Sequence, residues 1–117
     1  MTMKVSDVFV SIGVADHAAG CAWWSTLIGR APDRRPMPSC CEWDLAGSVL
    51  LQVLDSPKQG AVDTVSLRLE ELDAEIARLR GEGISIDDPE KVPGFDTLRI
   101  ATFADPDGNT VNLLGGA

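Results

Sequence analysis

The sequence predicts an α+β domain built from two similar halves, and three observations support this prediction. Each half begins with an alternating apolar segment, continues with a segment of helical periodicity, and ends in two or three short strand-like segments. This order occurs twice at a period near half the chain, which is typical of a pseudo-twofold domain. The 117 residues fit a single domain, with modules at about residues 1–58 and 60–117.

The first strand and the first helix follow from simple patterns. Residues 8–14 (VFVSIGV) alternate with the period of two that a strand shows when one of its faces packs in a core. Asp16 can accept a backbone N–H as the cap of a helix, and Gly29 can end that helix. The helix carries Trp23 and Trp24, which we expect to pack in the core.

The rest of the first half is predicted to be a loop followed by a hairpin. Residues 30–38 contain three prolines and are predicted to form the loop. Residues 40–45 and 48–54 are short strand-like segments, which we expect to pair around a tight turn at Ala46 and Gly47.

The second half repeats this order with a longer loop. Its predicted elements are a strand at residues 64–69, a helix from Leu72 to Gly81 or Gly83, a short strand at 84–86, a loop at 89–96, and a hairpin of strands 97–104 and 109–114. The hairpin turns at Asp105-Pro106-Asp107-Gly108-Asn109, where proline presets the turn and glycine supplies a positive φ angle.

Alignment of the two halves pairs residues that we expect to be equivalent. A shift of 55 positions aligns residues 10–14 with 65–69, and a shift of 60 positions aligns residues 51–53 with 111–113. Gln52 and Asn112 therefore take related places. In such a fold each helix covers one face of its strands, and the other face is left to form a cup.

Composition and charge limit the class of partner. Apolar residues make up 44% of the chain and charged residues 24%, and no segment approaches the roughly 20 continuous apolar residues of a membrane span. The net charge of -8 argues against nucleic acid or an anionic membrane surface as a partner, and it favours a cationic ligand. Residues 1–4 lead straight into a strand-like segment, so we expect no signal peptide and a cytoplasmic protein.

The cysteines and the histidine show no recognisable site pattern. Cys21, Cys40 and Cys41 lack metal-ligand spacing, and a bridge between Cys40 and Cys41 would be strained because adjacent strand residues point to opposite faces. We therefore expect reduced, partly buried thiols. His17 lies at the start of the first helix, where a solvated imidazole is expected.

Three segments carry most of the information about family: VFVSIGVADHAAGCAWWSTLIG, LEELDAEIARLRGEGI and FADPDGNTVNLL. Together they resemble the vicinal oxygen chelate superfamily, which includes glyoxalase I, bleomycin resistance proteins and extradiol dioxygenases. The resemblance covers essentially the whole chain. It implies two βαβββ modules whose strands form a curved, mostly antiparallel sheet around a ligand cavity, with the helices on the outer face. It also implies a homodimer.

The same resemblance implies where a metal would bind. In metal-dependent members the ligands lie on the first and last strands of each module, and these places fall here on Phe9, Gln52, Thr64 and Asn112. Those ligands are mainly His and Glu, with Gln seen occasionally, and none of the four residues here is His or a carboxylate. Gln52 alone is a weak ligand. A catalytic metal needs about three ligands such as imidazole, carboxylate or thiolate groups. We therefore expect no metal and no cofactor.

Strand alternation predicts which side chains face the cup. If the apolar residues of each alternating strand face the helices, the residues between them line a mixed apolar and polar cavity, which is the usual composition of a small-molecule site. Trp43 could stack on a flat ligand or fill the core. The predicted ligand-contacting residues are Phe9, Ser11, Trp43, Gln52, Thr64, Ser66, Arg68 and Asn112, with Leu50 and Thr110 in the same wall.

These features favour a metal-independent small-molecule-binding protein of the glyoxalase and bleomycin-resistance type, with an antibiotic or a secondary metabolite of aromatic or cationic character as its ligand. No Ser-His or Cys-His pair has useful spacing, so no catalytic residue is assigned. One alternative is a metal-independent isomerase, cyclase or lyase of a biosynthetic pathway that uses Arg68, Glu42 or Asp44, although these are expected to be exposed strand charges. Another is a non-catalytic interaction module with a closed cup.

Overall fold

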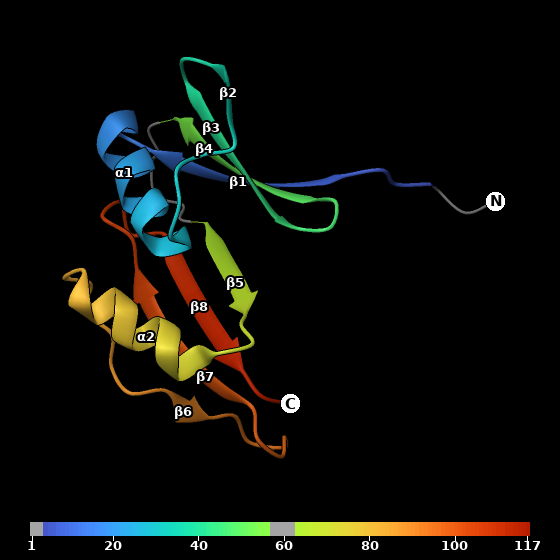
Figure 1. Cartoon of the computed structure of the whole chain (residues 1–117), viewed down its shortest axis with the longest axis vertical. Coiled ribbons are helices and arrows are strands. Elements are labelled where there is room, and N and C mark those ends of the chain that lie inside the picture. Colours follow the sequence, from blue (N-terminus) through green and yellow to red (C-terminus); the bar gives the residue numbers. More distant parts are fainter. Residues whose placement is uncertain (1–3, 57–62) are drawn as a thin grey trace. The chain divides into compact units, whose positions relative to one another are not determined.

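The computed structural model describes residues 4–56 and 63–117. The chain divides into two compact units, residues 1–63 and residues 64–117, and each unit contains one helix and one four-stranded sheet (Figure 1). The fold class is α+β, as predicted. Both units follow the order strand, helix and then three strands, which is the order of a βαβββ module.

The first unit consists of β1 (Val8–Val14), α1 (His17–Ile28), β2 (Arg34–Met37), β3 (Cys40–Ala46) and β4 (Val49–Asp55). Its sheet has the strand order β1-β4-β3-β2. β1 is an edge strand and pairs parallel with β4, whereas β3 pairs antiparallel with both β4 and β2. The predicted strand at residues 8–14 is therefore confirmed at its predicted bounds.

Helix α1 begins and ends at the predicted caps. The Asp16 carboxylate accepts a hydrogen bond of 3.0 Å from the backbone N–H of Ala19, which satisfies one free donor of the first turn. Gly29 adopts a φ angle of 93°, a left-handed conformation that favours glycine, and its N–H donates to the Ser25 carbonyl.

The core of the first unit lies between α1 and one face of the sheet. Trp24 is fully buried, whereas Trp23 is half-buried and meets Trp24 edge-on at a ring distance of 5.2 Å. Only one of the two tryptophans predicted for the core is therefore enclosed completely. The buried apolar residues of this layer include Ile12, Val14, Trp24, Leu27, Trp43, Leu51 and Val53.

The prediction of a loop across residues 30–38 is wrong in part, because β2 occupies four of these residues. β2 is an edge strand that pairs only with β3. Pro36 can lie in an edge strand because its missing N–H removes no bond from a central ladder. The pairing is irregular: Arg34 opposes Glu42 and Met37 opposes Cys40, with a register shift between them.

The second unit consists of β5 (Thr64–Arg68), α2 (Leu72–Gly81), β6 (Glu90–Lys91), β7 (Arg99–Ala104) and β8 (Thr110–Gly115). Its strand order, β5-β8-β7-β6, repeats the topology of the first sheet: the edge strand β5 pairs parallel with β8, and the other two pairs are antiparallel. The buried residues of α2 are Leu72, Ile76 and Leu79, whose helical spacing places them on one side of the helix.

Strand register supports the internal alignment of the halves. Ser11 lies opposite Gln52 in the first sheet, and Ser66 lies opposite Asn112 in the second. These are the pairs that shifts of 55 and 60 positions superpose. The repeat therefore extends from element order to individual residue pairs.

The short strand predicted at residues 84–86 is absent, and those residues form coil. Ile86 is buried as its apolar character suggests, but its carbonyl accepts two hydrogen bonds, of 3.0 and 2.7 Å, from the Arg80 guanidinium. A side chain thus satisfies the backbone acceptor that a neighbouring strand would otherwise bind. The fourth strand of the unit is instead β6, inside the segment predicted as a loop.

The predicted turn before β8 is stabilised by its own side chains. The Asp105 carboxylate accepts hydrogen bonds from the backbone N–H groups of Asp107 and Asn109, at 3.0 and 2.8 Å, and from the Asn109 amide at 2.8 Å. Gly108 has a φ angle of 84°, as the predicted turn requires. Asp105 and Asn109 are both buried, so this hydrogen-bonded turn fixes the start of β8.

Candidate functional site

Each sheet has one face that the helix of its own unit does not cover, and we call this its open face. In β1 the side chains of Ile12 and Val14 face the core, while Phe9 and Ser11 are exposed. In β4 the alternation is similar, with Leu51 buried and Gln52 half-buried. Alternation therefore places polar side chains on the open face, as predicted.

A continuous chain of hydrogen bonds crosses the open face of the first sheet. The Ser11 hydroxyl donates to the Gln52 side-chain carbonyl at 2.9 Å, and the Gln52 amide donates to the Glu42 carboxylate at 2.6 Å. The Arg34 guanidinium donates to the other Glu42 oxygen at 3.2 Å. We call these four residues the first polar row, and they come from β1, β4, β3 and β2 in their order across the sheet.

Glu42 differs from its prediction. It was expected to be an exposed strand charge, but it is only 6% exposed. Its charge is compensated by Arg34, which also binds both oxygens of the exposed Asp44 at 2.8 and 2.7 Å. Hydrogen bonds with Asp44 and then with Glu42 raise the pKa of Arg34 above its ordinary value. A buried carboxylate held by a guanidinium and an amide is a rigid acceptor.

The second sheet has a corresponding second polar row of three residues. The Thr102 hydroxyl donates to the Asn112 side-chain carbonyl at 2.7 Å, and the Asn112 amide donates to the Ser66 hydroxyl at 3.1 Å. Thr102 was not among the predicted site residues, although the shift of 60 positions aligns it with Glu42. Unlike the first row, the second polar row contains no charge.

The remaining predicted site residues occupy different environments. Phe9 is 54% exposed on β1, and Thr64 lies on β5 opposite Thr110. The Arg68 guanidinium donates to the Gly116 carbonyl at 2.7 Å, which holds it against the C-terminal segment.

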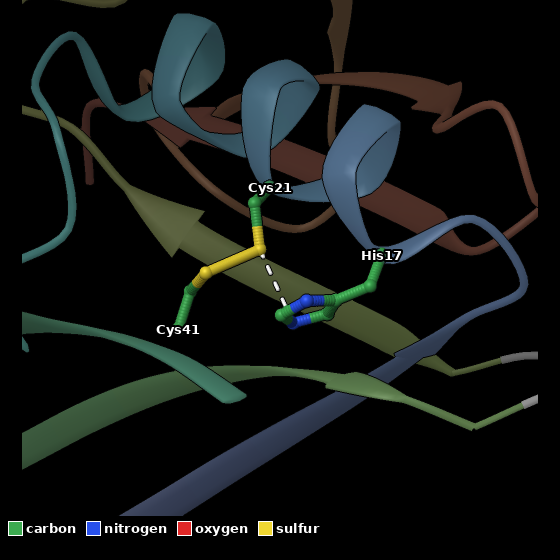
Figure 2. A group of neighbouring side chains, drawn as sticks. All are labelled: His17, Cys21 and Cys41. Carbon is green, nitrogen blue, oxygen red and sulfur yellow. Dashed lines mark hydrogen bonds between the residues drawn. A yellow bond between two sulfur atoms is a disulfide. The ribbon is translucent and has the colours of Figure 1, made fainter. Parts of the chain in front are cut away.

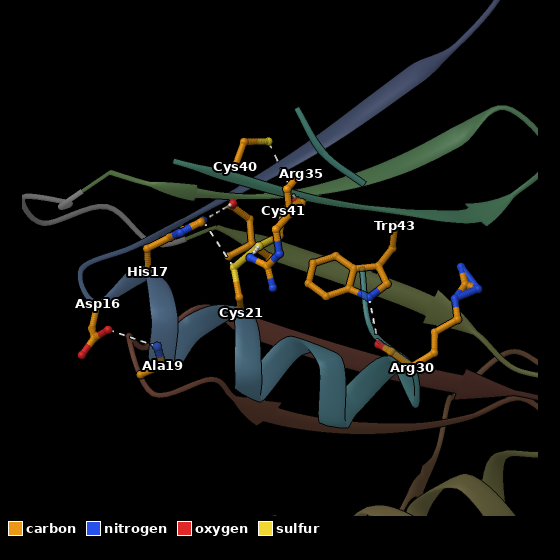
Figure 3. Close-up of a disulfide and its surroundings, with 10 residues drawn as sticks. Asp16, His17, Ala19, Cys21, Arg30, Arg35, Cys40, Cys41 and Trp43 are labelled. Carbon is orange, nitrogen blue, oxygen red and sulfur yellow. Dashed lines mark hydrogen bonds between the residues drawn. A yellow bond between two sulfur atoms is a disulfide. The ribbon is translucent and has the colours of Figure 1, made fainter. Parts of the chain in front are cut away.

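Trp43 does not belong to the open face. Its ring is fully buried on the side of the sheet that faces α1, and its indole N–H donates to the Arg30 carbonyl at 3.1 Å (Figure 3). Trp43 was predicted either to stack on a flat ligand or to fill the core, and in the structure it fills the core. Its inclusion among the ligand-contacting residues was therefore wrong. Because β3 places Cys41 and Trp43 on one face, it places Glu42 on the other.

The four places where the superfamily keeps metal ligands do not fit a divalent ion. Phe9 has no lone pair to donate, and Thr64 offers only a hydroxyl. The side chains of Gln52 and Asn112 are each engaged through both their oxygen and their nitrogen atoms within the polar rows. A divalent ion would therefore find no anionic ligand at these four places.

The second unit also contains a cavity of about 380 Å³ at the start of α2. Asp73 and Arg99 lie in its wall and form a two-pronged ion pair at 3.1 and 2.8 Å. The hydrogen bond and charge of Arg99 lower the pKa of Asp73. No residue of the second polar row lines this cavity, so the two features are separate.

Cys21 and Cys41 form a disulfide that ties α1 to β3 (Figure 2). The expectation of reduced thiols is therefore wrong for these two residues and holds only for Cys40, which is free and buried. Burial, and secondarily the charge of Glu42, raise the pKa of the Cys40 thiol. The two cysteines are 20 residues apart in the sequence, and their pairing depends on how α1 packs on the sheet. The sequence therefore did not indicate the disulfide.

His17 was expected to be a solvated imidazole, but its ring makes two contacts inside the first unit. Its Nε2 atom lies 3.0 Å from the Val53 carbonyl and 3.3 Å from the Cys21 sulfur (Figures 2 and 3). A carbonyl can only accept, so Nε2 carries the proton in this bond. The signal available in the sequence was the spacing of four residues between His17 and Cys21, which puts both side chains on one side of a helix.

Comparison with known proteins decides the family. Residues 7–114 match the family described as Glyoxalase-like domain. The chain belongs to this family. The match spans both units and confirms the resemblance to the vicinal oxygen chelate superfamily.

Two solved structures illustrate this similarity. One is a glyoxalase/bleomycin resistance protein from Catenulispora acidiphila, with 25% identity, a TM-score of 0.84, and coverage of 97% of this chain and 100% of that one. Another is TnmS3, an antibiotic binding protein from a Streptomyces species, with 26% identity, a TM-score of 0.80, and coverage of 99% and 100%.

A further neighbour, the oxidase ChaP-H2, shares 20% identity at a TM-score of 0.76 over 98% of this chain and 96% of that one, which shows a common fold alone. No curated protein matches the chain. None of the helices in the described residues is long and apolar enough to cross a membrane.

Proposed function

We propose that this glyoxalase-like protein binds a small molecule without a metal and sequesters an antibiotic or a secondary metabolite at the open faces of its sheets. The observation that carries the proposal is the pair of polar rows. Amides stand at Gln52 and Asn112, where metal-dependent relatives place charged ligands, and each amide is locked between neighbouring side chains. Such rows offer oriented donors and acceptors for a ligand.

The name of one structural neighbour supports a binding role. TnmS3 is described as an antibiotic binding protein, and it aligns with essentially the whole of this chain. A shared fold does not by itself fix function, because one fold hosts many activities. The proposal therefore depends on the side chains of the open faces.

The ligand that we propose is aromatic, cationic or both. Phe9 exposes more than half of its surface on the open face beside the first polar row, and an exposed ring offers a stacking surface. The net charge of -8 attracts cations over a distance. The other proposed ligand contacts are Ser11 and Gln52 on the open face of the first sheet, and Thr64, Ser66, Arg68 and Asn112 on that of the second sheet.

A homodimer in the cytoplasm is part of the same proposal. A second copy of the chain could cover the open faces of the sheets. Burial of the exposed Phe9 ring against that copy would be favourable. Sedimentation equilibrium checks this point: two chains per particle support it, and a monomer at micromolar concentration opposes it.

Isothermal titration calorimetry with two probes tests the function. Metal-free bleomycin and the planar aromatic cation proflavine are titrated into the protein with and without excess EDTA. We expect saturable binding of at least one probe, unchanged by the chelator. Native mass spectrometry of the protein from its own host would then identify any small molecule that it retains.

A matched pair of variants locates the binding. Phe9 and Phe95 are exposed to 54% and 55%, respectively, but only Phe9 lies on the proposed site. Phe9→Ala should weaken binding by about tenfold, whereas Phe95→Ala should leave it unchanged. Binding lost in EDTA, or equal effects of the two variants, would refute the proposal.

Glu42 favours one alternative function. A buried carboxylate held by Gln52 and Arg34 on the open face of the first sheet could act as a base in a metal-independent isomerase, cyclase or lyase. In that case Glu42→Gln would abolish turnover while ligand binding persists. If no probe binds and no retained molecule is found, the remaining alternative is a non-catalytic interaction module.

A further inference from the structure

A cluster of soft metal ligands lies inside the first unit, on the side of the sheet opposite the first polar row. Its members are His17 and Cys21 on α1 and Cys41 on β3, and their ligand atoms all lie within 4.8 Å of one another (Figure 2). Cys40 and Cys41 are adjacent on β3, so their side chains point to opposite faces of the sheet. The cluster is therefore separate from the proposed ligand site.

We infer that, when the Cys21–Cys41 disulfide is reduced, His17, Cys21 and Cys41 bind one Zn²⁺ ion. Two thiolates and one imidazole are a ligand set that zinc accepts, with a water molecule in the fourth position. None of these residues occupies a place where the superfamily binds its metal. The inferred site belongs to this chain's own α1 and β3.

The spacing of the ligand atoms suits zinc. Two sulfur atoms bound tetrahedrally at about 2.3 Å from zinc are about 3.8 Å apart, and a sulfur and a nitrogen atom are slightly closer. The Cys21 sulfur and His17 Nε2 are already 3.3 Å apart, because residues four apart on a helix are neighbours. Once reduced, the two sulfur atoms need to separate only to van der Waals contact.

The surroundings also suit a bound zinc ion. Cys21 and Cys41 are buried, and two buried thiolates would be costly without a compensating cation. A Zn²⁺ ion makes the group of two thiolates neutral. Arg35 Nη1 lies 2.8 Å from the Cys41 sulfur and can donate a hydrogen bond to that ligand. His17 is half-buried, which leaves a route from solvent.

Zinc binding requires one local rearrangement. His17 Nε2 now donates its proton to the Val53 carbonyl. A ring nitrogen cannot donate a hydrogen bond and bind a cation at the same time, so ligation through Nε2 breaks the bond to Val53, and the ring proton moves to Nδ1 by exchange with water.

The disulfide and the zinc site exclude each other. A dithiol reductant transfers two electrons and two protons to the Cys21–Cys41 bond and becomes a cyclic disulfide, which leaves two protein thiols. Zn²⁺ then displaces the two thiol protons and forms two zinc–sulfur bonds. An oxidised small-molecule disulfide reverses both steps and releases the ion. The cluster thus binds zinc only in a reducing environment.

Titration with Co²⁺, followed by Zn²⁺, tests the inference. The Cys40→Ser protein is prepared in its disulfide form and in a form reduced with a dithiol that is then removed under anaerobic conditions. Cys40→Ser removes the one thiol outside the cluster. We expect the reduced form to bind one Co²⁺ ion with a thiolate-to-cobalt charge-transfer band that Zn²⁺ abolishes. The disulfide form should bind none.

Further variants assign the ligands. His17→Ala should weaken Co²⁺ binding by at least about tenfold, and Cys21→Ser should remove most of the charge-transfer absorbance. Wild-type protein should match Cys40→Ser in stoichiometry and spectrum. The comparison of the two redox forms needs no ligand variant, so a variant that fails to fold leaves the test intact. No binding by the reduced form, equal binding by both forms, or binding insensitive to His17→Ala would each overturn the inference.

Discussion

Gln52 and Asn112 show how much chemistry depends on one functional group. An amide has nearly the shape of the corresponding carboxylate, but it is neutral and has a donor as well as an acceptor. In both polar rows the amide nitrogen and oxygen bind different neighbours, which fixes the orientation of the side chain. A carboxylate could accept from both sides but could not donate to Glu42 or to Ser66. The first row requires an amide, because the Glu42 carboxylate can only accept; the Ser66 hydroxyl of the second row could also donate. Both amides lack the charge that a metal needs.

The second polar row should make a measurable contribution to stability. Asn112→Leu removes both hydrogen bonds of the row while keeping a similar side-chain volume. The row is partly exposed, so each bond contributes modestly, and we expect the free energy of unfolding to fall by about 1 kcal/mol. Urea unfolding followed by circular dichroism measures the change.

Thr102 provides the control for this prediction. Thr102→Ser keeps the hydroxyl that donates to Asn112, so it should change the free energy of unfolding by less than Asn112→Leu does. Equal losses for the two variants would mean that the row contributes packing alone.

At the scale of single elements, most of the fold was predictable because local and tertiary signals agree. The caps at Asp16 and Gly29 and the turn before β8 use side chains and φ angles that only a few residue types supply. The errors arose where a non-local contact decided the outcome. β2 exists because β3 presents an edge to residues 34–37, and residues 84–86 are coil because Arg80 binds their backbone.

The candidate site was predictable to a similar degree. Alternation identifies which residues of β1, β4, β5 and β8 share a face, because the direction of strand side chains has a strict period of two. Alternation does not identify which residues of β3 point toward the helix and which point toward the open face. For this reason Trp43 was assigned to the open face and Glu42 to solvent. The Cys21–Cys41 pair depends on helix packing, for which adjacent sequence carries no signal.

The disulfide between α1 and β3 should stabilise the first unit. A cross-link that closes a loop of about 20 residues restricts the unfolded chain and is worth about 3 kcal/mol. Reduction of the wild-type protein by a dithiol should therefore lower the urea midpoint substantially. EDTA is present in both samples so that zinc cannot stabilise the reduced form.

Two variants serve as controls for the disulfide prediction. Cys41→Ser should already have the lower midpoint, and dithiol should not lower it further. Cys40→Ser keeps the cross-link and should respond to dithiol as the wild type does. A wild-type midpoint that is insensitive to dithiol would show that the cross-link adds no stability.

At the scale of the whole molecule, the two units repeat one topology, but their polar rows differ in charge. The first polar row contains Glu42 and Arg34, whereas the second contains only hydroxyls and an amide. A ligand group bound at the first polar row would meet a carboxylate and a guanidinium, whereas a ligand group bound at the second polar row would meet only neutral donors and acceptors. The repeat thus provides two related surfaces, and their side chains make them unequal.

The net charge of the chain predicts how ligand binding depends on salt. With a charge of -8, a cationic probe such as proflavine is attracted over a range set by the Debye length, which falls from about 30 Å at about 0.01 M salt to about 3 Å at about 1 M. Its affinity should therefore fall by about tenfold across this range, measured by titration calorimetry. A neutral aromatic probe of similar size is the control and should lose little affinity, because stacking on Phe9 is not screened by ions. If both probes respond equally to salt, the acidic charge serves solubility and has no part in selecting the ligand.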